Sequence, residues 1–149
     1  MNEVEVQWTS PMNNADLSNM SAHACYFRVI EVDKSVAGFM LAMRDGCAYE
    51  NDNLAWFESR YSDFMYIDRI VIDADFASRK LGTSLYQDAF SVALTLGLER
   101  VVSEYNWAPR NVPSEIFHSK HGFQEVGQRD FADSDKVVSM QCLELGGIN

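Results

Sequence analysis

The sequence of 149 residues has little cysteine and proline and no long apolar run. Its three cysteines, Cys25, Cys47 and Cys142, are scattered without a C-x-x-C pair, which excludes a zinc-ribbon pattern and provides no disulfide framework. No stretch approaches the roughly 18 consecutive apolar residues of a membrane span. The first residues carry acids rather than the basic segment that begins a signal peptide. We therefore expect one cytoplasmic domain over residues 1–149, with no metal and no membrane partner.

Basic residues are also scarce: 12 lysines and arginines stand against 22 aspartates and glutamates, for a formal net charge of −10. Because phosphate contacts need a basic surface, we expect no nucleic-acid partner. The segment 69–120 is balanced, with six basic and six acidic residues, so the rest of the chain carries the whole acidic excess. This distribution suits an anionic cofactor held within the balanced segment and a cationic second substrate. An acidic surface that only favours solubility would have the same composition.

The spacing of apolar residues predicts an α/β fold. The segment 82–97 has the i, i+3, i+4 spacing of an amphipathic helix, and Gly97 is a natural stop signal. The run 64–73 is nearly continuous in apolar residues, as in a strand covered on both faces. The full predicted order is a helix over 11–24, a β-hairpin over 25–43 with its turn at 33–35, a helical turn over 54–59, strand 64–73, helix 82–97, strand 99–106, helix 114–121, and closing strands 123–129 and 136–145.

The connection between strand 64–73 and helix 82–97 could bind an anion. A helix that follows a strand and a turn presents unpaired backbone N–H groups at one point, and here Arg79 and Lys80 lie beside them. An ordinary strand–helix connection can have the same composition. Neither a G-x-x-x-x-G-K-[ST] loop nor a G-x-G-x-x-G loop is present, so the two best-known phosphate-binding motifs are excluded.

Three segments together resemble the GNAT superfamily of acetyl-CoA-dependent N-acetyltransferases. They are the run IVIDADFASRKLGTSLY (70–86), the strand 99–105, and the segment from Asn106 to the motif FHSKHGF (117–123). The resemblance covers roughly residues 25–145. It implies a mixed, mainly antiparallel central sheet flanked by helices and splayed between strands 64–73 and 99–105. It also implies acetyl-CoA as co-substrate, with its pantetheine arm inserted into the splay.

The resemblance assigns cofactor contacts along both strands and the turn. Backbone N–H groups near Ile70, Val71 and Ile72 would polarise the thioester carbonyl. The remaining implied cofactor-binding residues are Ala77, Ser78, Arg79, Lys80, Leu81, Gly82, Thr83, Asn106, Asn111 and Phe117.

The chain departs from the family pattern in two places. The family's turn [QR]-x-x-G-x-[GA] falls on Ala77, Lys80 and Gly82, and only Gly82 matches. The frame Arg79-x-x-Gly82-x-Ser84 fits better locally but misplaces Leu85. A lysine at the glycine position should need a positive φ, at a cost of about 1 kcal/mol. The family's first strand and helix are largely missing, so the reading frame is truncated or the segment 4–7 serves as a shortened strand.

The resemblance also identifies candidate catalytic residues. His118 aligns with the tyrosine of the family motif Tyr-x-x-x-Gly-Phe and could protonate the leaving thiolate, or it could only pack on the cofactor, leaving Tyr105 or water as the donor. Glu104 and Asp68, on the strands that should flank the cofactor, are the candidate general bases, acting through water. Asp68 could instead pair with a neighbouring arginine, although strand alternation should send Asp68 and Arg69 to opposite faces.

The acceptor site is expected in the connection 44–63. Tyr49, Asp52, Trp56 and Phe57 offer the carboxylate and aromatic faces that an ammonium group prefers, although the same aromatics could be tucked under a surface loop. These features predict an enzyme on which an amine of a small molecule or peptide attacks acetyl-CoA directly in a ternary complex. The alternative is a non-catalytic acyl-CoA-binding module of the same fold. A homodimer is compatible with the sequence.

Overall fold

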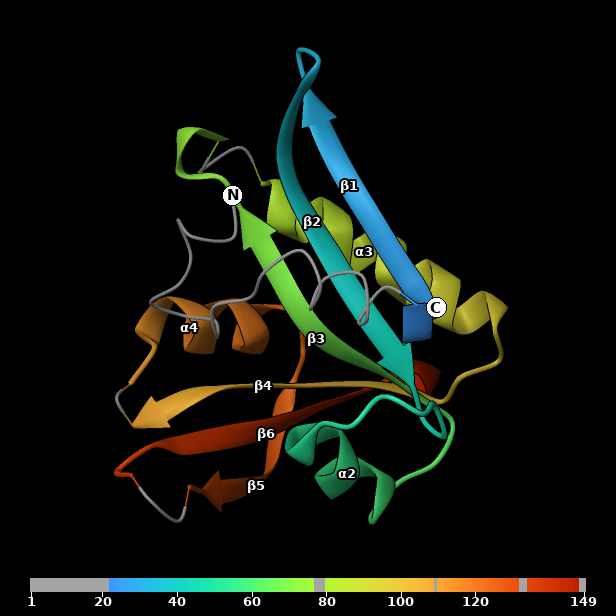
Figure 1. The fold of residues 1–149 in the computed structure, drawn as a ribbon, viewed down its shortest axis with the longest axis vertical. Helices are drawn as coiled ribbons and strands as arrows, with labels where there is room; N and C mark the ends of the chain where they lie inside the picture. The colour runs from blue at the N-terminus through green and yellow to red at the C-terminus, as the bar shows by residue number, and fades with distance from the viewer. Residues whose placement is uncertain (1–21, 77–79, 109, 132–133, 148–149) are drawn as a thin grey trace.

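The computed structural model describes residues 22–76, 80–108, 110–131 and 134–147, and a six-stranded sheet organises them (Figure 1). The strand order is β1-β2-β3-β4-β6-β5, and every neighbouring pair is antiparallel except β3 and β4. The strands are β1 (Tyr26–Val32), β2 (Ser35–Arg44), β3 (Phe64–Ile72), β4 (Arg100–Ala108), β5 (Gln124–Asp130) and β6 (Val137–Glu144). The predicted mixed, mainly antiparallel sheet is therefore confirmed.

Helices cover both faces of this sheet. The helices are α2 (Asp52–Glu58), α3 (Leu81–Thr95) and α4 (Val112–Lys120), with short 3-10 turns at Ala74–Phe76 and Leu145–Gly147. Strand β2 is buried without interruption from Ala37 to Met43. Its side chains on both faces of the sheet must therefore be covered, which requires helices on both sides. Its Met40 packs in the cluster under α3, whereas its Leu41 packs in the cluster under α2. The two apolar cores thus lie back to back across the sheet.

Several predicted boundaries shift by a few residues. β4 continues to Ala108, and α4 begins at Val112, where Pro113 fits the first turn. The predicted strand at 4–7, and all but the end of the predicted helix over 11–24, lie outside the described residues. In the described part of the chain, no helix is long and apolar enough to cross a membrane.

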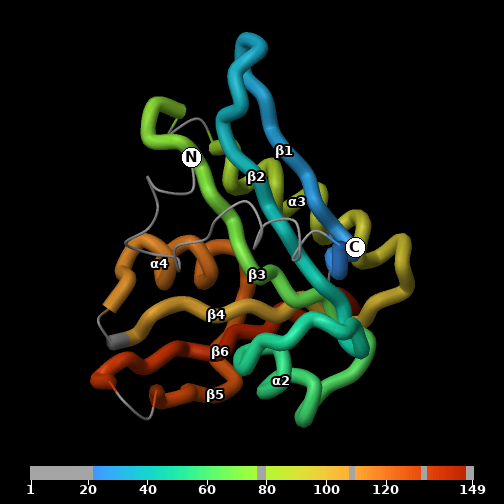
Figure 2. Tube along the Cα trace, in the orientation of Figure 1, coloured from blue at the N-terminus to red at the C-terminus, as the bar shows by residue number. Residues whose placement is uncertain are grey.

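The sheet splits between its two parallel strands, as predicted. β3 and β4 pair only at Phe64↔Arg100, Met65↔Val101 and Tyr66↔Val102. Beyond these pairs the strands diverge, and α4 lies beside the gap between their far ends (Figures 1 and 2). At the point of separation the Ser103 hydroxyl donates to the Ile67 carbonyl at 3.1 Å. Farther along, the edge of β3 that faces β4 has no partner strand among the described residues, so its backbone groups can bind a ligand.

A β-bulge in β3 lies next to the split. Leu41 of β2 pairs with Arg69 and Ala42 pairs with Ile67, so Asp68 is an extra residue without a partner. A bulge re-aims neighbouring side chains. Arg69 Nε lies 3.9 Å from Asp68 Oδ2, and both side chains are almost fully buried. The expectation from simple alternation, that these two side chains lie on opposite faces, is therefore wrong.

Candidate active site

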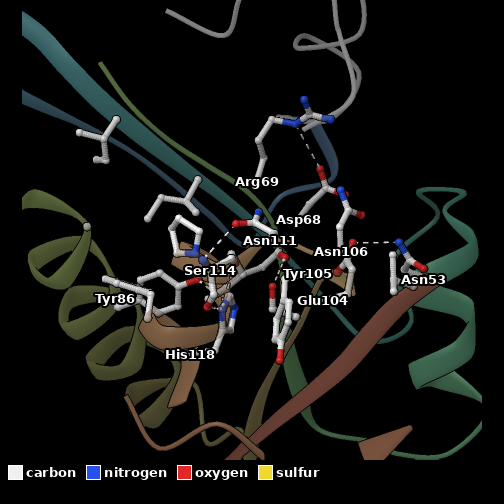
Figure 3. Close-up of a pocket in the computed structure, with 18 of the residues that line it drawn as sticks. Asn53, Asp68, Arg69, Tyr86, Glu104, Tyr105, Asn106, Asn111, Ser114 and His118 are labelled. Atoms are coloured by element: carbon white, nitrogen blue, oxygen red, sulfur yellow. Dashed lines mark hydrogen bonds and ion pairs between the residues drawn. The ribbon is translucent and has the colours of Figure 1, made fainter. Parts of the chain in front are cut away.

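The split sheet opens a cavity of about 810 Å³ (Figure 3). Its walls are the diverging halves of β3 and β4, the start of α3, the inner side of α4, the start of α2 and the ends of β5 and β6 that face them. One cavity therefore connects a helix N-terminus with a group of buried carboxylates. The site residues predicted from the sequence lie at one of these two ends of the cavity or in the apolar core of the protein.

At the α3 end, the first residues of the helix line the cavity. Lys80 precedes the helix in the left-handed conformation, with φ 58° and ψ 28°, which confirms the positive φ expected of a lysine at the glycine position. The first hydrogen bond of the helix runs from Ser84 N to Lys80 O at 3.2 Å. The amides of Leu81, Gly82 and Thr83 therefore have no partner within the helix, and all three residues line the cavity. Ala77, Ser78 and Arg79 lie outside the described residues.

The other proposed cofactor residues differ in their placement. Ile70 and Ile72 line the cavity, whereas Val71 is fully buried in the core, as strand alternation requires. Phe117 lines the cavity and lies against the start of α3, where a Cβ on Gly82 would stand 3.5 Å from its ring.

Asn106 and Asn111 both line the cavity and fix the turn from β4 to α4. The Asn111 amide donates to the Asn106 carbonyl at 2.9 Å, and Asn111 Oδ1 accepts from Ser114 N at 3.1 Å as the N-cap of α4. Asn111 therefore has a structural role whether or not it also contacts a ligand.

His118 is a buried, neutral imidazole. Its Nδ1 lies 2.8 Å from the Ser114 carbonyl, which can only accept, so Nδ1 carries the proton. Nε2 is then an acceptor, 3.5 Å from the Tyr86 hydroxyl. Burial lowers the pKa of His118 to about 4, so the ring is uncharged at neutral pH. Tyr105 packs beside it, with ring centroids 5.3 Å apart.

Glu104 occupies the centre of the cavity wall on β4. Its Oε1 accepts two hydrogen bonds of 2.8 Å, one from the Tyr66 hydroxyl and one from Asn53 Nδ2. Figure 3 shows Glu104 and Asn53 at the cavity. Glu104 Oε2 is shielded from solvent and has no hydrogen-bond partner among the described residues. Burial, and secondarily the charge of Asp68, raises the pKa of Glu104 to about 7. A carboxylate with that pKa and a free oxygen can accept a proton near neutrality.

Asp68 lies on the opposite wall, at the bulge of β3. Its Oδ1 accepts from Asn51 Nδ2 at 3.2 Å, and burial raises its pKa to about 6 against the opposing effect of Arg69. Asn51 is also the N-cap of α2, where its Oδ1 accepts from the amides of Asn53 and Leu54. The first turn of α2 therefore contacts both carboxylates.

Of the four residues proposed for the acceptor, only Asp52 lines the cavity. Phe57 is fully buried among the aromatic rings of the second core. Trp56 packs against Gly127, where a Cβ would lie 2.6 Å from the indole, and the Arg60 guanidinium lies 3.7 Å from the centroid of the Trp56 ring. Tyr49 packs near His23, with ring centroids 6.2 Å apart.

The sequence analysis missed several cavity residues. They are Asn51, Asn53, Arg129, Phe131 and Lys136, and the sequence analysis also missed Tyr66, a core residue that binds Glu104. The Asn51 N-cap has a local sequence signature, because an asparagine precedes a short apolar helix. Arg129, Phe131 and Lys136 come from the end of β5 and the start of β6, far in sequence from the other cavity residues. No group of three or more His, Cys, Asp or Glu side chains within the described ranges could hold a metal ion.

Several solved structures share this fold, among them proteins named as acetyltransferases. The ribosomal-protein-S18-alanine N-acetyltransferase of Escherichia coli superposes with a TM-score of 0.71 at 14% identity, covering 96% of this chain and 84% of that one. Ard1 of Thermoplasma volcanium gives 0.74 at 18% identity, covering 95% and 85%. A candidate streptothricin acetyltransferase of Bacillus anthracis, in complex with acetyl coenzyme A, gives 0.62 at 19% identity, covering 78% and 60%.

No curated protein sequence matches the chain. A family model, by contrast, matches residues 2–123, most of the chain, and its description is the acetyltransferase (GNAT) family. The matched segment includes the split strands, the left-handed turn before α3 and the buried Glu104. The chain therefore belongs to the GNAT family of acetyltransferases.

Proposed function

We propose that this protein transfers the acetyl group of acetyl-CoA to a primary amine of a small molecule or peptide, by direct attack in a ternary complex, with Glu104 as general base. The single observation that carries the proposal is the environment of Glu104. One of its oxygens is held by Tyr66 and Asn53, and the other is buried and free at the wall of a cavity that reaches the start of α3.

The residues at the α3 end fit the anionic part of acetyl-CoA. The amides of Leu81, Gly82 and Thr83 are a set of donors at a helix N-terminus, which favours phosphate. Lys80 adds a positive charge at the same point. The GNAT turn motif usually has glycine at this position. The open edge of β3 near Ile70 and Ile72 would bind the acyl arm and polarise the thioester carbonyl. Acetyl-CoA supplies the activated acetyl group.

The base is needed because a protonated amine has no lone pair for attack. With a pKa of about 7, Glu104 is largely ionised just above neutrality and can take the proton of an ammonium, directly or through one water. Tyr66 and Asn53 fix the orientation of the carboxylate so that Oε2 is the oxygen that receives the proton. Asp68 across the cavity keeps the pKa of Glu104 raised.

Two residues remain candidates for the group that protonates the leaving thiolate. His118 has the position that the family resemblance indicates, but its proton lies on Nδ1 and is bound by the Ser114 carbonyl. Tyr105 lines the same wall, and burial raises the pKa of its phenol, so it keeps its proton at neutral pH. We propose that one of these two groups, or water, is the donor.

Calorimetry with acetyl-CoA and a coenzyme A release assay with a panel of amines test the proposal. We expect binding of acetyl-CoA, turnover with at least one amine, and loss of turnover in Glu104→Gln with binding retained. The exposed Glu31→Gln on β1 is the matched control. An absence of acetyl-CoA binding at millimolar concentration would refute the enzymatic function. Binding without turnover on any amine would instead support a non-catalytic acyl-CoA-binding module.

A further inference from the structure

Two cations share one aromatic ring at the end of the cavity formed by β5 and β6. The Arg129 guanidinium lies 4.4 Å from the centroid of the Phe131 ring, and Lys136 Nζ lies 4.7 Å from it. All three residues line the cavity. No carboxylate of the described residues forms an ion pair with Arg129 or Lys136, although the protein as a whole is strongly acidic. Two like charges on one aromatic ring, with no counter-ion among the described residues, form a site that an anion would stabilise.

Arg129 is connected to the general base through a single side chain. Its Nε donates to Asn53 Oδ1 at 2.9 Å, while Asn53 Nδ2 donates to Glu104 Oε1 at 2.8 Å. Arg129 Nε and Glu104 Oε1 are linked by these two hydrogen bonds and the Asn53 side-chain amide between them. The two atoms are therefore at most about 8 Å apart. A ligand that reaches both groups therefore needs an amine and an anionic group only a few bonds apart.

We infer that the acceptor amine carries a carboxylate close to it, and that Arg129 and Lys136 bind this carboxylate while Glu104 faces the amine. The inference rests on the proposed acetyl transfer and specifies its acceptor. Free amino acids, and peptides whose N-terminal residue is acidic, both present this chemistry. Polyamines and other polycations do not, because their additional charges would be placed against Arg129 and Lys136.

The opposite end of the cavity already has donors for the phosphates of acetyl-CoA. Those donors are the α3 amides and Lys80, whereas Arg129 and Lys136 come from β5 and the start of β6, beside the first turn of α2. The two cations are therefore assigned to the acceptor and not to the cofactor.

Matched acceptors test this inference directly. The coenzyme A release assay would compare L-amino acids with their C-terminal amides, and peptides that begin with Asp or Glu with peptides that begin with Asn or Gln. An amide has the more reactive amine at neutral pH, because loss of the carboxylate charge lowers the pKa of its ammonium. A higher kcat/KM for the acid would therefore have to come from binding. Calorimetry of the same compounds with the protein and coenzyme A provides a readout independent of turnover.

We expect the acid of a matched pair to be preferred by about tenfold or more, as for a charge-assisted hydrogen bond. Lys136→Met should lower that preference about tenfold, because one of the two cations that bind the carboxylate is removed. Lys136→Arg should retain the preference, and Lys34→Met at the tip of the β1–β2 hairpin should not affect it. A larger preference among the free amino acids would identify a free amino acid as the acceptor. A larger preference among the peptides would identify a peptide with an acidic N-terminal residue.

Equal or faster acetylation of amides and polyamines by the wild-type protein would overturn the inference and leave acetyl transfer intact. An unchanged acid preference in Lys136→Met would overturn it as well. Failure of acetyl-CoA to bind would instead refute the proposed function, and would be visible before any acceptor is added.

Discussion

Asp68 and Glu104 face one cavity from two strands that pair for only three residues before they separate. Each carboxylate is held by an asparagine from the first turn of α2, Asn51 for Asp68 and Asn53 for Glu104. The charge of Asp68 contributes to the raised pKa of Glu104. The short helix α2 therefore sets the orientation of both acids, and the bulge at Asp68 brings the first of them to the cavity wall.

Replacement of the base should abolish most of the rate. Glu104→Gln keeps the size of the side chain but cannot accept a proton, and we expect kcat/KM to fall by about 10²- to 10³-fold, within the usual range for a general base. In the wild type kcat/KM should rise with pH through about 7, because the base must be ionised. In Glu104→Gln that rise should disappear while acetyl-CoA affinity stays unchanged. A variant with wild-type kcat/KM would exclude Glu104 as the base.

Asp68→Asn provides a separate test of the coupling between the two acids. Removal of the Asp68 charge removes one of the two effects that raise the pKa of Glu104, so the pH at which kcat/KM reaches half its maximum should move to lower values. The asparagine can still bind Asn51, and calorimetry with acetyl-CoA should give wild-type affinity. An unchanged pH profile would mean that Asp68 does not influence the base.

The fold follows from the sequence because it depends on patterns that act locally. A nearly continuous apolar run located β3, apolar periodicity located α3, and the resemblance supplied the split between β3 and β4. The orientation of Asp68 relative to Arg69 was predicted wrongly, because alternation with a period of two does not reveal an inserted bulge residue. Phe57 was proposed for the acceptor by its residue type, but its position on α2 faces the core. Arg129 and Lys136 gave no local signal, since only tertiary packing brings β5 and β6 to the cavity.

The free energy of unfolding should fall on both the acid and the alkaline side, because different buried groups act on each side. Folding raises the pKa of Glu104 and of Asp68 above their unfolded-state pKa values near 4. The stability that these two groups contribute is therefore fully present below about pH 4 and is lost as the pH rises to about 7. The lowered pKa of His118 acts oppositely, so its contribution is lost as pH falls from 6.5 to about 4. Thermal denaturation should show that Glu104→Gln reduces the loss on the alkaline side and His118→Phe reduces the loss on the acid side. Identical pH profiles in all three proteins would contradict these shifts.

The role of the lysine that precedes α3 can be tested by comparison with a second lysine that also has a positive φ. Lys80 and Lys34 have φ values of 58° and 68°, and only Lys80 lines the cavity. Glycine at either position should relieve strain and raise the free energy of unfolding by up to about 1 kcal/mol. Lys80→Gly should also weaken acetyl-CoA binding, by about tenfold, because a charge near the phosphates is lost. Lys34→Gly should leave the affinity unchanged. Equal affinities in the two variants would mean that the Lys80 side chain does not contact the cofactor.

The proton donor can be assigned with two phenylalanine variants that conserve ring volume. If His118 protonates the thiolate, His118→Phe should lower kcat by about 10²-fold with little change in acetyl-CoA affinity, and the loss should shrink at low pH where solvent supplies the proton. If His118 only packs, the KM for acetyl-CoA should change and kcat should stay within a few-fold. Since its proton is bound by Ser114, we expect the second result. Tyr105→Phe should then produce the larger fall in kcat, because it removes the phenol from the same wall. Wild-type kcat in both variants across pH 6 to 9 would exclude both side chains and leave water as the donor.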